Sequence, residues 1–97
     1  MNNIFETGKI YSEGWTLVEE REFNEKEKAS VDGCVVEEGD YGLSVKFHLV
    51  EGGHFFIPLG RDSKLKENDK VDINNLHLLT LATNGRRNIT RVTEVEG

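Results

Sequence analysis

Apolar and polar residues alternate most regularly near the middle of the chain. Within residues 43–50, Val45, Phe47 and Leu49 fall on one side of an extended segment, and serine, lysine and histidine residues fall on the other. This period of two, in a segment rich in β-formers, is typical of a half-buried strand. A second alternating segment, 54–59, follows a Gly-Gly pair, which supplies the positive φ angles of a tight hairpin turn. The pattern therefore predicts an antiparallel hairpin made of these two segments.

Three other segments have the composition of strands. Residues 31–38 precede the hairpin and extend it into a three-stranded meander. Residues 76–83 and 89–95 are joined by Asn84-Gly85, a dipeptide that strongly indicates a hairpin turn. The connection between the meander and this second hairpin contains a serine that caps an expected helical turn at 64–67. This order of elements is that of an OB-fold, and it predicts a mainly β protein, a small five- to six-stranded OB-like barrel.

The N-terminal third of the chain fits two interpretations. Residues 15–18 have the composition of a strand, whereas Thr16 and Glu19 also fit a capping box at the start of a helix. Few apolar residues continue a helical stripe beyond residue 18. We therefore expect a strand followed by a solvated, charged connection over residues 19–28.

The length and the charge of the chain constrain its organisation. A chain of 97 residues is expected to hold one hydrophobic core. We place an acidic N-terminal segment, mobile or docked, at 1–28 and the OB-like barrel at 29–97. The formal charge is −6, and residues 1–38 carry all of this excess. The remainder is neutral overall, and a neutral body with local basic patches can bind an anionic ligand.

The sequence contains no signal for entry into a membrane. No apolar run approaches the roughly 20 residues that cross a bilayer, and the first residues lack the basic start and apolar stretch of a signal peptide. Cys34 is the only cysteine, so no internal disulfide forms. These features predict a soluble, cytoplasmic protein without a membrane partner.

Two groups of motifs carry a resemblance to known proteins. Residues 65–71, Leu-Lys-Glu-Asn-Asp-Lys-Val, resemble the turn that leads into the fourth strand of OB-type single-stranded DNA-binding proteins, with Asn68 where those proteins usually have glycine. Asn84-Gly85 followed by Arg91-Val92 resembles the closing hairpin of the same family. Residues 42–92 also resemble small uncharacterised proteins of phages and mobile elements, with similar Gly-Gly, aromatic-pair, Ile-Pro-Leu and Arg-Asp-Ser motifs. The resemblance covers about half of the chain and implies an OB-like barrel of the single-stranded DNA-binding type.

Residues suited to catalysis or metal binding are few and scattered. Zinc sites need three or four converging ligands, and the three histidines and Cys34 show neither a Cys-x-x-Cys nor a His-x-x-x-His spacing. We expect Cys34 to be structural, because nothing in the sequence indicates a histidine or a helix N-terminus that lowers its pKa. Adjacent acids such as Glu19-Glu20 point to opposite faces of a strand and cannot flank one bond. We therefore expect no enzyme activity, no metal and no cofactor.

The strongest candidate site combines basic and aromatic residues. Proteins that bind single strands stack bases on aromatic rings and contact phosphates with cations. Phe47 and Phe55 fall on one face of two adjacent strands and are expected to point to the core. Lys46, His48 and Phe56 then share the opposite face, and we expect them at the centre of a site for single-stranded nucleic acid. Four arginines are expected at its rim: Arg61, Arg86, Arg87 and Arg91.

The acidic N-terminal segment offers an alternative function. It carries Tyr11, Trp15 and Phe23 among its acids, and large aromatic residues are enriched among the anchors of protein interfaces. A charged segment with such residues either docks on the barrel or meets a partner. The alternative is a protein-interaction or inhibitory accessory protein, of the phage or mobile-element type, that acts through this segment.

Overall fold

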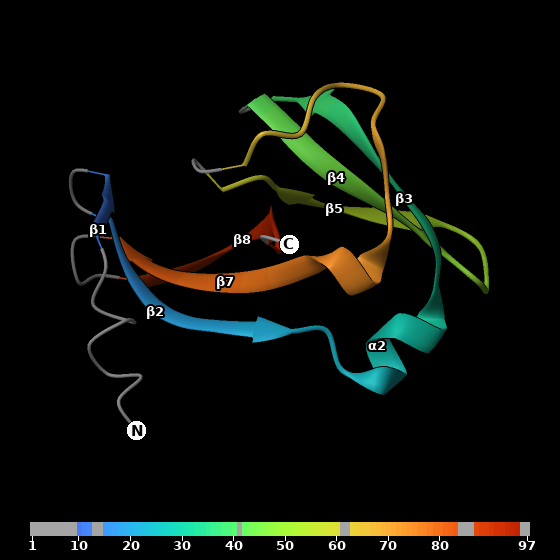
Figure 1. Ribbon diagram of the computed structural model, residues 1–97, viewed down its shortest axis with the longest axis horizontal. Coiled ribbons are helices and arrows are strands. Elements are labelled where there is room, and N and C mark those ends of the chain that lie inside the picture. Colours follow the sequence, from blue (N-terminus) through green and yellow to red (C-terminus); the bar gives the residue numbers. More distant parts are fainter. Residues whose placement is uncertain (1–9, 13–14, 41, 61–62, 84–86, 96–97) are drawn as a thin grey trace.

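The chain folds into two antiparallel β-sheets (Figure 1). The computed structural model describes residues 10–12, 15–40, 42–60, 63–83 and 87–95. One sheet has the strand order β1-β2-β7-β8, and the other has the order β5-β4-β3-β6. The first contains β1 (Ile10–Ser12), β2 (Trp15–Glu22), β7 (Leu76–Thr83) and β8 (Arg87–Glu94). The second contains β3 (Val31–Gly39), β4 (Gly42–Leu49), β5 (His54–Pro58) and β6 (Lys70–Val71).

The two sheets pack against each other without closing into a barrel. They are joined at one corner, where Leu59 forms a parallel bridge with Val92 and the Gly60 amide donates to the Val92 carbonyl at 2.8 Å. Within the described residues, no strand pairing joins β6 to β1 at the opposite edges. The predicted mainly β class is confirmed, whereas the predicted barrel is wrong. At the open edge, β6 contributes only two residues.

The main core lies between the sheets. Its buried side chains come from both sheets and from the residue that follows β2: Phe23, Cys34, Val36, Val45, Phe47, Leu76 and Val92. The ring of Phe47 is fully buried. Its centroid lies 5.5 Å from that of Phe23 and 4.9 Å from that of Phe55, which is stacked on it. The apolar side of residues 43–50 therefore faces inward, as the alternation predicts.

Strand β7 is apolar on both faces. Leu76 belongs to the main core, whereas Leu79 and Leu81 join Leu17 in a second buried cluster. Leu81 lies opposite Leu17 in the ladder between β7 and β2. Since successive residues of a strand point to opposite sides, the leucine-rich sequence of β7 serves two clusters, one on each side of its sheet.

Strand β2 extends the strand expected at residues 15–18. It continues to Glu22 and pairs with β7, with a bulge between Leu17 and Glu19. Residues 15–22 therefore belong to a sheet: they pair with β7, and Trp15 and Thr16 also pair with β1. The solvated connection expected from residue 19 onward is replaced, over its first part, by a paired strand.

A short helix, α2 (Glu25–Ser30), occupies the rest of that expected connection. Asn24 begins it with a capping box: the Asn24 side chain accepts from the Glu27 amide, and the Glu27 carboxylate accepts from the Asn24 amide, each at 2.8 Å. Such a cap satisfies backbone groups that the first turn leaves free. Because α2 has no buried residue, no apolar stripe indicates it in the sequence.

The connection before β6 differs from its prediction in one respect. Residues 64–67 form no helix, and the Ser63 hydroxyl donates to the Glu94 carboxylate at 2.7 Å instead of capping one. The turn expected at Asn68-Asp69 is present, and Asn68 has a φ of 76°. Asparagine is one of the few residues besides glycine that adopt this left-handed conformation readily. A 3₁₀ helix, η1 (Ile73–Asn75), follows β6.

Candidate nucleic-acid interface

The outer face of the sheet β5-β4-β3-β6 carries the residues expected at the centre of the site. In β4, Phe47 points into the main core, whereas Lys46 and His48 lie on the opposite face. The ladder between β4 and β5 pairs Lys46 with Phe56 and His48 with His54. Directly paired residues share a face of the sheet. Lys46, His48 and Phe56 therefore lie together, as the alternation predicts.

Phe56 presents an exposed aromatic ring on this face. The residue is 46% exposed, and the Lys46 ammonium lies 5.9 Å from its ring centroid. The His54 ring meets the Phe56 ring edge-on, with 5.3 Å between centroids, and lies 6.4 Å from the His48 ring. We call these four residues the Phe56 cluster. An exposed ring beside a cation is suited to stacking on a base and contacting a phosphate.

An acidic residue on β3 reduces the positive charge near the Phe56 cluster. Lys46 Nζ lies 3.8 Å from Glu37 Oε2, and the two side chains are 22% and 40% exposed. Glu37 pairs with Ser44 across the β3–β4 ladder, which places it on the outer face. Sequence reasoning missed this contact, because it depends on the register between two strands. It also missed Lys70, an exposed residue opposite Val35 on β3.

Two of the four arginines expected at the rim fall within the residues that the structure describes. Arg87 and Arg91 lie on β8, in the other sheet. The Arg91 guanidinium lies 4.9 Å from the Trp15 ring centroid, and burial lowers the pKa of Arg91. An arginine nevertheless stays protonated in proteins, so Arg91 acts as a fixed cation on Trp15. Two of the expected residues, Arg61 and Arg86, fall outside the described residues.

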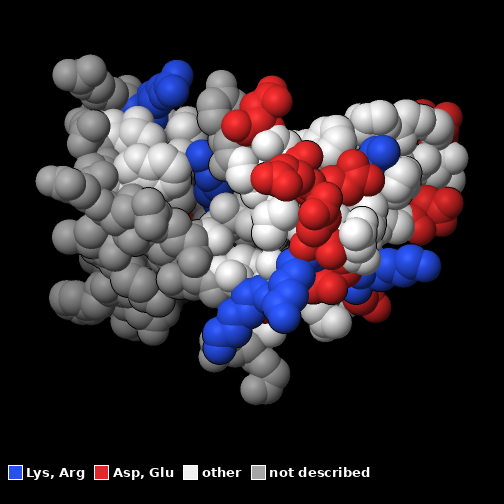
Figure 2. Space-filling view, turned by 90° about the horizontal axis from the view of Figure 1, so that it is seen from above, with Lys and Arg blue, Asp and Glu red and all other residues white. Residues whose placement is uncertain are grey.

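Charges of both signs are mixed on the side of the molecule that Figure 2 shows. A band of acidic side chains crosses the middle of this view, and lysine and arginine side chains lie on either side of it. Exposed acids of the described residues include Glu38, Asp40 and Glu67, at the end of β3 and in the connection before β6. This side therefore offers local cations rather than a continuous basic surface.

The aromatic residues expected to contact a protein partner are packed where the structure describes their side chains. Phe23 is 5% exposed and contacts Phe47 in the main core, so its ring is not presented at the surface. Trp15 is half-buried against the second cluster and lies beside Arg91. Tyr11 belongs to β1. An interface role for Trp15 and Tyr11 stays a prediction.

Cys34 has the environment of a structural thiol. It is buried, and burial together with the nearby charge of Asp72 raises the pKa of the thiol to about 11. A thiol with this pKa is almost entirely protonated at neutral pH and is a poor nucleophile. His77 Nδ1 lies 2.9 Å from Glu20 Oε2. Within the described residues, no three His, Cys, Asp or Glu side chains gather into a group that could hold a metal ion.

Comparison with known proteins gives no further indication of function. No family model, curated protein or solved structure matches this chain. The resemblance to OB-type and phage proteins therefore stays an expectation from sequence motifs. In the part of the chain that the structure describes, no helix is long and apolar enough to cross a membrane. The Phe56 cluster is thus the main structural indication of function.

Proposed function

We propose that the protein is a small non-enzymatic module that binds single-stranded nucleic acid on the outer face of the sheet β5-β4-β3-β6. One observation carries this proposal: Phe56 exposes an aromatic ring beside Lys46, on two paired strands. Stacking on an aromatic side chain contributes about 1–3 kcal/mol per base and tolerates every base, and a neighbouring cation attracts the phosphates. The Phe56 cluster supplies both kinds of group on one face.

A protein interface on the acidic N-terminal segment is the alternative. Such an interface depends on exposed aromatic anchors, but Phe23 lies in the core and Trp15 is half-buried beside Arg91. Strand β2 also pairs with β7 along one edge, and Trp15 and Thr16 pair with β1 on the other edge, so the backbone around Trp15 is already paired on both sides. These contacts favour the nucleic-acid proposal over the alternative.

Phe56→Ala is expected to weaken binding of an oligo-dT strand about 5- to 100-fold, because it removes the stacking surface. Phe56→Trp keeps a ring at the same position and is expected to bind about as tightly as the wild type. Fluorescence anisotropy of a labelled oligo-dT strand measures the affinities of both variants. The titration is made at low salt, because phosphate contacts weaken as salt is added. Val95→Ala, which shortens another exposed apolar side chain, is the control. No binding by the wild type, or equal binding by Phe56→Ala, would contradict the proposal.

Removal of the acid beside Lys46 is expected to strengthen binding. Glu37→Gln releases the Lys46 ammonium and removes a charge that repels phosphate, so we expect about two- to fivefold tighter binding, in the range of an exposed ion pair. Glu38→Gln is a matched control, because it changes the net charge equally but lies opposite Leu43, on the other face of β3. The dissociation constants of both variants for oligo-dT are compared at one low salt concentration. If the two bind alike, the Lys46–Glu37 pair has no part in the site.

A further inference from the structure

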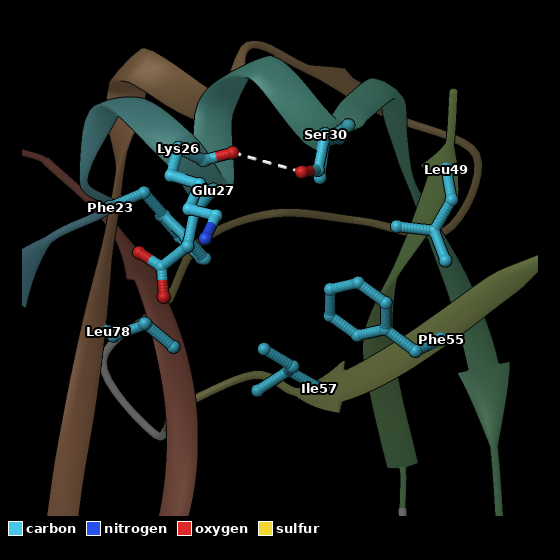
Figure 3. A pocket seen from close by; sticks show the side chains of 9 residues that line it. Phe23, Lys26, Glu27, Ser30, Leu49, Phe55, Ile57 and Leu78 are labelled. Atoms are coloured by element: carbon cyan, nitrogen blue, oxygen red, sulfur yellow. Dashed lines mark hydrogen bonds between the residues drawn. The ribbon is translucent and has the colours of Figure 1, made fainter. Parts of the chain in front are cut away.

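An apolar pocket lies beside α2, at the surface of the molecule (Figure 3). Its volume is about 230 Å³. Side chains from α2, from the β4–β5 hairpin and from β7 surround it. Six of the lining residues are apolar: Phe23, Val31, Leu49, Phe55, Ile57 and Leu78. Phe55 and Phe56 are neighbours on β5, so the pocket and the Phe56 cluster lie on opposite faces of that strand.

The pocket has an aromatic wall that solvent reaches. Phe55 is 38% exposed, although its ring stacks on the buried ring of Phe47. In Figure 3 the ring of Phe55 and the side chains of Ile57 and Leu78 border an open hollow below α2. An apolar cavity of about 150 Å³ accommodates a benzene ring. This pocket therefore has room for one aromatic ring or a short aliphatic chain.

Two charged residues of α2 line the pocket, and their bonding differs. The Glu27 carboxylate accepts from both Nη atoms of Arg21, at 3.0 and 3.1 Å, and from the Asn24 amide at 2.8 Å. The hydrogen bond from Arg21, followed by that from Asn24, lowers the pKa of Glu27. Lys26, by contrast, makes no ion pair with any other residue that the structure describes. The charge that is available to a ligand is therefore positive.

The position of the Lys26 side chain suits a ligand in the pocket. Figure 3 shows the ammonium group directed from α2 toward the hollow. The Ser30 hydroxyl is already engaged, since it donates to the Lys26 carbonyl at 2.9 Å. Small-molecule sites commonly combine an apolar lining with a few polar groups that fix the orientation of the ligand. Lys26 is the polar group in this pocket that remains able to do so.

We propose that this pocket binds a small carboxylate that carries one apolar group, such as an aryl-substituted or short alkyl carboxylate. The apolar group lies against Phe55 and Ile57, and the carboxylate accepts a charge-assisted hydrogen bond from Lys26. A cationic ligand is expected to bind less tightly, because the Glu27 carboxylate already pairs with Arg21. A neutral ligand of the same shape makes the apolar contacts with Phe55 and Ile57 but lacks the charge-assisted hydrogen bond from Lys26.

Three compounds of similar shape test this proposal on the full chain: 3-phenylpropionate, its neutral amide and 3-phenylpropylamine. NMR methyl resonances of Val31, Leu49, Ile57 and Leu78 report on the pocket. We expect saturable shifts of these methyls with 3-phenylpropionate, at a Kd of about 1 mM or tighter. The amide is expected to bind more weakly and the amine most weakly.

Lys26→Gln is expected to abolish the preference for 3-phenylpropionate over its amide, an effect of about threefold, the size of an exposed ion pair. Lys66→Gln removes an exposed lysine near the turn before β6 and is expected to leave the preference unchanged; both positions are exposed, so neither change disturbs the core. Three results would each overturn the proposal. They are an absence of shifts at the pocket methyls up to about 10 mM, equal binding of carboxylate and amide, and an unchanged preference in Lys26→Gln.

Discussion

Replacing Phe47 by alanine is expected to lower the free energy of unfolding by about 3–5 kcal/mol. The ring is fully buried between those of Phe23 and Phe55, in a core to which both sheets contribute. Its removal forfeits the apolar burial of the ring and leaves a cavity that the surrounding side chains fill only in part. The total stability of a domain is commonly about 5–15 kcal/mol, so the loss is a large share of it.

Urea unfolding followed by circular dichroism measures this loss. Phe56→Ala deletes the same atoms from a position that is 46% exposed, and we expect it to cost less than about 1 kcal/mol. The comparison therefore separates burial from the chemistry of the substitution. A loss for Phe47→Ala no larger than that for Phe56→Ala would mean that the sheets do not pack around Phe47.

Leu17→Ala is expected to lower the free energy of unfolding by about 2–5 kcal/mol, whereas Val18→Ala is expected to change it by less than about 0.5 kcal/mol. Leu17 is 2% exposed and packs with Leu79 and Leu81 in the second cluster. Val18 follows it on β2 and is 45% exposed. Both substitutions shorten an aliphatic side chain at adjacent positions, so the difference between them reports burial.

The same two variants show how residues 15–22 are held. Their urea midpoints are compared with that of the wild type under identical conditions. A large shift for Leu17→Ala alone indicates that β2 is an integral strand of its sheet. If the two variants unfold at the same midpoint, this strand is not packed, and the N-terminal segment behaves as a mobile extension.

The middle of the chain was predictable, because its strands bury one face and expose the other. Phe47 is fully buried, and Lys46 and His48 point outward from the same strand. The Gly-Gly pair also indicated the turn correctly, since Gly52 and Gly53 have φ angles of 105° and 84°, which suit glycine. The Phe56 cluster could be predicted for the same reason, as a consequence of period two.

The other sheet was harder to predict, because its strands break the simple alternation. Leu76 and Leu79 of β7 are buried on opposite sides, so that strand has no polar face. Leu17 is the only buried residue of β2, and the strand ends in five exposed positions, which gives it the composition of a loop. The number of strands in this sheet depends on these two segments, because β2 pairs with β7.

Contacts between distant segments could not be predicted from local patterns. Glu37 reaches Lys46 only because the register of β3 and β4 places them near each other. The pocket beside α2 requires Phe23, Leu49 and Leu78, which belong to different elements of the chain. Such sites arise from tertiary packing, and no spacing within one segment indicates them.

The pairing of β2 with β7 also affects the order in which strand pairs can form while the chain is synthesised. Trp15 lies opposite Thr83, whereas β3, β4 and β5 follow one another and pair with their neighbours in the sequence. On the ribosome the meander can assemble early, but β2 cannot complete its pairing with β7 until Thr83 has emerged. Pairing between such distant segments is slow, and an unpaired strand edge invites association with other chains. Charged residues within or beside a strand reduce such aggregation, and β2 carries a run of them at 19–22.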